Sequence, residues 1–308
     1  MASQEKQQIY EQTRSVYHAQ HQRIINDDIA MKCHLSMFSL EYFRKPDGYF
    51  TGKKCLDAGC GDTAKVTIAL HKLGAEHVTS VDIGNEFIPI AYQNVRKYGV
   101  PDDAVSFLSA SVTNLPFPSE SFDFVACHGV IVHLPDVEDA DRAFSELARV
   151  TRRGGDLYIV GGLVGGLFED SIIPALRNYY RENSEFRQTI DNLTPEQFLS
   201  LFDFIAKQFE ARGETMPLTR EIIASLFDVD FCVTIQNEIQ APVRLALDES
   251  FYVDRYLLYG FESPTRLRRY VERKNIRRFF APLHYHREHP ISKLLYGSGN
   301  LEFISRKL

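Results

Sequence analysis

The chain has 308 residues, of which 44% are hydrophobic and 25% are charged, and its formal net charge is −6. This length allows a large buried core, and the balance of apolar and charged residues is that of a globular protein. The negative net charge argues mildly against a protein whose main partner is nucleic acid.

The N-terminal stretch MASQEKQQIYEQ lacks the apolar segment of a secretory signal. No stretch approaches the roughly 20 apolar residues that are needed to span a bilayer. The five cysteines form no C-x-x-C pair; they are Cys33, Cys55, Cys60, Cys127 and Cys232. We therefore expect reduced, mostly buried thiols, a cytoplasmic location and no membrane span.

Residues 1–50 show helical periodicity up to a turn at 45–48, which predicts an N-terminal helical cap. From residue 51 to residue 162, short apolar runs alternate with amphipathic segments. Strands are predicted at 55–56, 77–81, 105–108, 122–127 and 157–160, and helices at 64–73, 86–98 and 136–150. This alternation predicts an α/β fold with a Rossmann-like, doubly wound and mostly parallel sheet.

Beyond residue 162 the alternation ends. Residues 163–218 predict a helical insertion, and the run Phe231–Ile235 predicts a sixth strand, so that 219–236 would return to the core sheet. Residues 237–298 predict a second insertion that covers the site. An antiparallel closing strand is predicted within 299–308.

The segment CLDAGCGDTAKVTIAL (55–70) passes from an apolar strand through two glycines directly into helix-like sequence. Because glycine has no Cβ, the main chain at Gly59 and Gly61 can approach a ligand or another part of the protein closely. Asp57 precedes the glycines, and Asp82 ends the next predicted strand, where a carboxylate can accept hydrogen bonds from both hydroxyls of a ribose. Together these features favour a nucleoside cofactor over an empty turn.

Two classes of cofactor fit this turn. Gly59-x-Gly61-x-x-Ala64 satisfies the dinucleotide pattern, so a nicotinamide or flavin enzyme is a genuine alternative. Asp57 favours a different cofactor, because a carboxylate at the strand end suits an ammonium group and repels a pyrophosphate. The methionine part of S-adenosylmethionine carries such an ammonium group.

Three segments between residues 55 and 160, about a third of the chain, carry a family resemblance. They are LDAGCG (56–61), NLPFPSESFDFVACHGVIVHL (114–134) and ELARVTRRGGDLYIV (146–160). In order and spacing they resemble the first motif, the fourth-strand region and the following helix and strand of class I S-adenosylmethionine-dependent methyltransferases. The fourth-strand region is most similar to the small-molecule subgroup that includes ubiquinone and menaquinone methyltransferases.

The resemblance implies that S-adenosyl-L-methionine is the cofactor and S-adenosyl-L-homocysteine the product. The matching cofactor-binding positions are Asp57, Ala58, Gly59, Gly61, Asp82, Ile83, Ser111, Val112 and His128. Asp57 would face the methionine ammonium, Asp82 would bind the ribose, and Ile83 would pack on the adenine. Ser111 and Val112 would contact the adenine edge, and His128 would lie beside the methionine end.

Two positions depart from the family pattern. Thr63 stands where a third glycine is common, and Ser111 replaces the usual acidic partner of the adenine. A serine hydroxyl can still accept a hydrogen bond from the adenine amine, although without charge assistance.

Methyl transfer needs a general base only where the acceptor must lose a proton. His133 matches a histidine that often follows the fourth strand in the resembling subgroup, and it is the predicted base; the alternative is a structural histidine that hydrogen-bonds a loop. Tyr17, His18 and His21 either fold over the pocket, as N-terminal helices often do in this family, or belong to an amphipathic helix on the sheet.

We therefore predict a methyltransferase of the EC 2.1.1 class that acts on a small-molecule acceptor by in-line displacement, and nucleic acid is not the expected partner. Three alternatives remain: an RNA or protein methyltransferase that uses the basic segment 266–278, a nicotinamide-dependent oxidoreductase, and a non-catalytic binding module. His284, His286 and His289 match no recognised ligand spacing, so no metal site is predicted. The acceptor, the methylated atom and the oligomeric state are not predicted.

Overall fold

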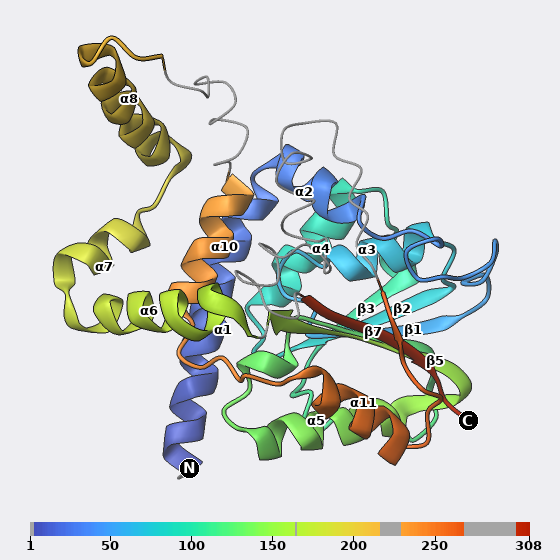
Figure 1. Cartoon of the computed structure of the whole chain (residues 1–308). Coiled ribbons are helices and arrows are strands. Elements are labelled where there is room, and N and C mark those ends of the chain that lie inside the picture. Colours follow the sequence, from blue (N-terminus) through green and yellow to red (C-terminus); the bar gives the residue numbers. More distant parts are fainter. Residues whose placement is uncertain (1–2, 164, 216–228, 268–299) are drawn as a thin grey trace.

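The computed structural model of the chain describes residues 3–163, 165–215, 229–267 and 300–308 (Figure 1). These residues form a seven-stranded sheet with the strand order β3-β2-β1-β4-β5-β7-β6. The strands are β1 (Lys54–Ala58), β2 (His77–Asp82), β3 (Val105–Ser109), β4 (Phe122–His128), β5 (Thr151–Leu163), β6 (Thr265–Arg266) and β7 (Asn300–Arg306). β1 to β5 are parallel, whereas β7 is antiparallel to both β5 and β6. The predicted doubly wound sheet with an antiparallel closing strand is confirmed.

Helices cover both faces of the sheet, so its central strands are buried on both sides (Figure 1). α3 (Lys65–Lys72) and α4 (Phe87–Lys97) lie on one face, and α5 (Val137–Val150) and α11 (Glu249–Leu258) lie on the other. Along β4, Phe124 and Ala126 join the first core while Val125 and Cys127 join the second. Short single-turn elements, η1 (Asp102–Ala104) and η2 (Ile131–His133), precede β3 and follow β4.

The N-terminal region, for which a helical cap over residues 1–50 is predicted, contains helices up to Leu35. It contains α1 (Ser3–Ile25) and α2 (Asp28–Leu35), and Asp27 caps α2 by accepting hydrogen bonds from two main-chain N–H groups. α1 lies alongside α10 (Val229–Gln240), at the end of the sheet where the parallel strands finish (Figure 1).

The segment predicted as a helical insertion, 163–218, contains several helices in its described part. It contains η3 (Phe168–Ile172), α6 (Ile173–Glu182), α7 (Ser184–Asp191) and α8 (Pro195–Ala211). α6 packs against α10, whereas α7 and α8 extend away from the sheet (Figure 1). Among the described residues, every helix is too short or too polar to serve as a membrane span.

The predicted sixth strand at Phe231–Ile235 is wrong. These residues belong to α10, which packs on α1 and α6, so the part of 219–236 that is described does not return to the sheet. Among the described side chains of α10, Cys232, Val233, Gln236 and Ile239 are buried, which is a helical spacing with a glutamine in one of the core positions. That polar residue hides the helical pattern, and packing against α1 outweighs the strand preference of the β-branched residues.

Residues 237–298 were predicted as one insertion, but their described part also contributes to the sheet. After α11, Thr265–Arg266 pairs with β7 as the two-residue strand β6. Residues 268–299 lie outside the described residues.

Candidate active site

The loop between β1 and α3 is held against β2 by its own main chain. The N–H groups of Gly59 and Cys60 donate to the carbonyl of Val81 at 2.7 and 3.1 Å. Gly59 and Gly61 have φ angles of +88° and +56°, in the left-handed region that favours glycine. The turn therefore depends on glycine at both positions.

Both glycines are closely approached by other parts of the protein. A Cβ on Gly59 would lie 2.2 Å from Cγ2 of Val130, and a Cβ on Gly61 would lie 2.5 Å from Cε1 of His21. Val130 precedes η2, and His21 belongs to α1. The bare main chain thus allows both the region beyond β4 and the N-terminal helix to close over the loop.

Asp57 is fully buried at the end of β1. Its Oδ2 accepts hydrogen bonds from the N–H and the Oγ1 of Thr67 at 3.0 and 2.8 Å. Among the described residues, no hydrogen-bond donor reaches Oδ1. Burial raises the pKa of Asp57 to about 7. A buried carboxyl oxygen in this position is suited to a cationic donor.

Asp82 ends β2 and ties the glycine loop to the next turn. Its Oδ2 accepts from the N–H of Gly61 and its Oδ1 from the N–H of Ile83, both at 2.7 Å. Burial raises the pKa of Asp82 to about 6, although part of the side chain remains accessible. Each carboxylate oxygen has a further lone pair, so the side chain can hold the loop and still accept from a diol.

The other predicted cofactor positions lie at the same edge of the sheet. Ala58 is buried at the end of β1, Ile83 follows β2, and His128 ends β4. Ser111 and Val112 follow β3; Val112 is buried in the core, while the hydroxyl of Ser111 lies 2.8 Å from that of Thr113. The structure therefore brings all nine positions to the carboxyl ends of β1 to β4, where ligands bind in doubly wound sheets.

α1 lies over this edge. His18 Nδ1 lies 2.6 Å from Oδ2 of Asp62, which directly follows the glycine loop, and Gln22 Nε2 donates to the same oxygen at 3.0 Å. Burial lowers the pKa of His21, which lies against Gly61, to about 3, so its imidazole is neutral near pH 7. The sequence left two interpretations of this helix: it covers the pocket, or it is an amphipathic helix that packs on the sheet. These contacts favour the first.

His133 ends η2 and is held by the same helix. The hydroxyl of Tyr17 lies 2.7 Å from Nε2 of His133, and their ring centroids are 4.8 Å apart. Burial lowers the pKa of His133 to about 3, and the charges of Arg244 and Arg177 lower it further. Its imidazole is therefore neutral near pH 7.

The region around His133 is closed by α6 and by the chain that follows α10. Arg244 pairs with Glu238, and a Cβ on Gly162 at the end of β5 would lie 2.6 Å from Nη2 of Arg244. The N–H of Leu245 donates to the carbonyl of Val132 at 2.7 Å, which ties this chain to η2. The sequence did not point to these contacts.

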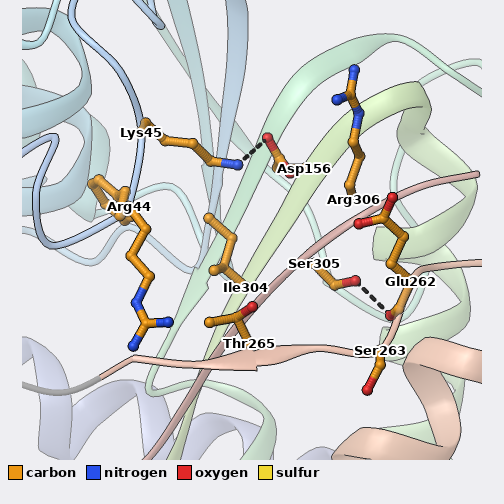
Figure 2. A pocket seen from close by; sticks show the side chains of 10 residues that line it. Arg44, Lys45, Asp156, Glu262, Ser263, Thr265, Ile304, Ser305 and Arg306 are labelled. Atoms are coloured by element: carbon orange, nitrogen blue, oxygen red, sulfur yellow. Dashed lines mark hydrogen bonds and ion pairs between the residues drawn. The ribbon is translucent and has the colours of Figure 1, made fainter.

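A separate cavity of about 260 Å³ lies between residues 43–45, β5, β6 and β7 (Figure 2). Its wall includes the ion pair between Lys45 and Asp156 at 2.8 Å and the hydrogen bond from the hydroxyl of Ser305 to the carbonyl of Glu262 at 2.7 Å. None of the predicted site residues lines it. Lys45 and Asp156 pair with each other, and we assign the cavity no part in the reaction.

Other candidates from the sequence contribute little to the described site. Cys55, Cys60, Cys127 and Cys232 are buried, as expected. Within the described ranges, no cluster of histidine, cysteine and acidic residues could hold a metal ion. Arg266 pairs with Glu249, while the remainder of the basic segment from 268 onward, and the histidines at 284, 286 and 289, lie outside the described residues.

Comparison with known proteins agrees with this geometry. Residues 56–159 match the family model for a methyltransferase domain. The methyltransferase GfsG of Streptomyces halstedii is 34% identical over 209 residues, which cover 67% of this chain and 71% of that protein. The ubiquinone/menaquinone biosynthesis C-methyltransferase UbiE of Psychromonas ingrahamii is 30% identical over 142 residues, 44% of this chain and 53% of its own.

A solved structure has a similar fold over nearly the whole chain. Magnesium protoporphyrin IX methyltransferase (ChlM) from Synechocystis PCC 6803, with bound S-adenosylhomocysteine, has a TM-score of 0.53 and 16% identity, and the match covers 98% of this chain and 100% of that one. The doubly wound sheet and this likeness thus define a Rossmann-like fold.

The chain belongs to the class I S-adenosylmethionine-dependent methyltransferases. It is therefore an enzyme of the EC 2.1.1 class, and this membership removes the nicotinamide interpretation of the same glycine pattern.

Proposed function

We propose that this enzyme methylates a small-molecule acceptor bound beneath a lid formed by α1, α6 and α10. The observation that carries this proposal is the closure of the lid over the strand ends. Tyr17 bonds His133, Gln20 donates to Gln240 at 2.7 Å, and Arg23 donates to Gln236. An enclosed site favours a small molecule, because a macromolecular acceptor needs an open face.

The residues at the strand ends fit the family's cofactor, and we assign cofactor binding to the nine predicted positions. Oδ1 of Asp57 is the buried acceptor for the methionine ammonium, and Asp82 accepts from the ribose hydroxyls. The main chain at Ala58, Gly59 and Gly61 lies against the cofactor, and Ile83, Ser111 and Val112 form the adenine side. His128 lies at the methionine end.

When bound, the cofactor supplies a methyl group that its sulfonium has already activated. The protein's task is to hold the acceptor atom about 3 Å from that carbon, in line with the breaking bond, and to exclude water. The lid suits this task, because its contacts close the same edge of the sheet as the cofactor residues.

Some methyl acceptors must lose a proton during the transfer. We propose that a histidine beyond β4 takes this proton, and sequence position assigns this role to His133. Its neutral imidazole has a lone pair for the purpose. Because Tyr17 already lies 2.7 Å from Nε2, His133 can act only if Tyr17 releases it or passes the proton through its own hydroxyl.

The experiment that tests this function has two stages. Calorimetry with S-adenosylhomocysteine should give binding heat, whereas NADH should give none. Formation of S-adenosylhomocysteine is then followed with a panel of hydroxylated small molecules, with RNA and with protein. Turnover only with RNA or protein would overturn the small-molecule assignment, and cofactor binding with no transfer to any acceptor would favour a binding module.

A further inference from the structure

The cavity beside residues 43–45 lies away from the edge of the sheet that carries the predicted cofactor positions. Asp156 and Arg306 line it (Figure 2); they are register partners of each other, in the first half of β5 and at the end of β7. The cofactor positions instead lie at or just after the carboxyl ends of β1 to β4. A ligand in this cavity of about 260 Å³ would therefore occupy a second site.

One of the carboxylates in the wall is already balanced by the protein. Asp156 is only 2% exposed, and its Oδ2 accepts a hydrogen bond from the hydroxyl of Tyr49 and lies 2.8 Å from Nζ of Lys45. The ammonium of Lys45 also lies 4.8 Å from the centre of the Tyr49 ring. These three side chains therefore hold one another and together carry no net charge.

Glu262 and Arg306 lie next to each other at the cavity without forming an ion pair. The N–H of Glu262 donates to the carbonyl of Arg306 at 2.9 Å, and both residues line the cavity (Figure 2). Within the described ranges, the guanidinium of Arg306 has no hydrogen-bond or ion-pair partner, and the carboxylate of Glu262 has none either. A cation and an anion on adjacent main chains are thus available to a ligand.

Two hydroxyl groups and two apolar side chains complete this part of the lining. Ser263 follows Glu262 and Thr265 begins β6, and no described residue forms a hydrogen bond with either hydroxyl. Phe43 and Ile304, both buried, supply the apolar part. The cavity can therefore hold a small molecule that has an apolar side, an anionic group and a group that both donates and accepts hydrogen bonds.

Arg44 adds a second cation, and its main chain is strained. Its φ is +54°, in the left-handed region, and the N–H of Lys45 donates across the turn to the carbonyl of Leu40 at 2.8 Å. Glycine is the usual residue at such a position, because a side chain there costs conformational energy. Among the described residues, the guanidinium of Arg44 has no acidic partner. A role for this charge at the cavity would explain an arginine in a place that suits glycine.

We propose that this cavity binds a small hydroxy acid. The guanidinium of Arg306 binds the carboxylate through two parallel hydrogen bonds, and Glu262 accepts a hydrogen bond from the hydroxyl. Arg44, Arg306 and Glu262 together carry one positive charge, which a single carboxylate balances. A doubly charged phosphate would bring its second charge close to Glu262, so like-charge repulsion disfavours it.

The first test compares L-lactate with two matched probes in thermal unfolding of the full chain. Propionate lacks the hydroxyl of lactate, and isopropanol has a methyl group in place of its carboxylate. A ligand that binds only the folded chain raises the melting temperature. General effects of each probe are removed by subtracting the shift that it gives in Arg306→Gln. We expect a clear difference with lactate, a smaller one with propionate and none with isopropanol.

Inorganic phosphate is the remaining probe, because phosphate is the other anion that arginine commonly binds. A larger difference with phosphate than with lactate would overturn the assignment of a hydroxy acid. Equal differences with lactate and propionate would overturn the role of the hydroxyl and of Glu262. No difference with any probe would overturn the site itself.

The second test measures the dissociation constant of lactate by titration. Arg306→Gln should weaken binding about tenfold. Arg142→Gln is the matched control, because it removes an exposed arginine of α5, on the face of the sheet opposite to Phe43. Glu262→Ala should bind lactate and propionate equally. Arg44→Gly should weaken lactate binding without lowering the melting temperature of the ligand-free chain, because glycine relieves the strained φ.

Unchanged lactate affinity in Arg306→Gln would overturn the proposal. The affinity for S-adenosylhomocysteine should be the same in Arg306→Gln as in the parent, because the cavity is separate from the cofactor edge. A parallel loss of both affinities would contradict a second site.

Discussion

The glycine loop and the lid form the two sides of the site, and they differ in how far apart their contacts lie in the chain. In the loop, Gly61 bonds Asp82 across 21 residues and Thr67 bonds Asp57 across 10. In the lid, Tyr17 bonds His133 across 116 residues and Gln20 bonds Gln240 across 220. The proposed cofactor side is thus a local structure, whereas the proposed acceptor side is assembled from remote segments.

This difference separates the effects that mutations should have. Changes in the loop should act first on cofactor binding, because its polar groups are the proposed ligands. Changes in α1 should act on closure and on the acceptor, with smaller effects on the sheet.

The largest effect is expected for Asp82→Ala, which removes the proposed acceptor of the ribose hydroxyls. Loss of two charge-assisted hydrogen bonds should weaken binding of S-adenosylhomocysteine by about a hundredfold in calorimetry. Because Asp82 also holds the N–H groups of Gly61 and Ile83, we expect a lower melting temperature as well. Asp103→Ala, which changes an exposed carboxylate before β3, is the control. Unchanged affinity in a folded Asp82→Ala protein would remove the ribose assignment.

A methyl group at residue 61 should displace the lid. In Gly61→Ala the new Cβ would lie 2.5 Å from the ring of His21, so this ring, or α1 with it, must shift, at a cost of about 2 kcal/mol in the free energy of unfolding. Limited proteolysis should then cut α1 faster. Gly99→Ala is the matched control, because Gly99 has a φ of +78° and no atom within 4 Å of its Cβ position. Equal effects in the two variants would show that strain, and not the contact with His21, is the cause.

The buried acid of β1 should give the apo protein a distinct pH dependence. Burial raises the pKa of Asp57 from 3.8 to about 7, so between these values the folded chain binds more protons than the unfolded chain. The contribution of Asp57 to stability therefore falls as pH rises through this window, by up to about 1.4 kcal/mol per pH unit, and levels off above it. Urea unfolding between about pH 5 and about pH 8 should show this slope in the parent relative to Asp57→Asn. Parallel curves would contradict the raised pKa of Asp57.

The smallest effect is expected for Tyr17→Phe, which removes the hydroxyl that bonds His133. The free energy of unfolding should fall by about 1 kcal/mol, with affinity for S-adenosylhomocysteine unchanged. Tyr10→Phe on the same helix removes a longer bond, 3.4 Å to Asp139, and should cost less. A large loss of cofactor affinity in Tyr17→Phe would mean that the two sides of the site are not separable.

Much of the fold was predictable because most strands of the sheet and the helices between them have a local sequence pattern, such as an apolar run or a capping residue. Asp136 caps α5 at the predicted start, and the apolar run from Phe122 forms β4 as expected. Phe231–Ile235 failed because its β-branched residues favour a strand in isolation, while contact with α1 decides for a helix.

In the site, too, local patterns were predictable from the sequence and contacts between remote segments were not. Asp57, Gly59, Gly61 and Asp82 stand at spacings that a local turn imposes, so the amino-acid order alone was enough to propose a nucleoside cofactor and the methyltransferase family. The order does not reveal that His21 closes on Gly61 or that Tyr17 bonds His133. Those contacts join residues that are neighbours only after the sheet has formed and its helices have packed, because side-chain hydrogen bonds act over about 3 Å in space whatever the separation along the chain.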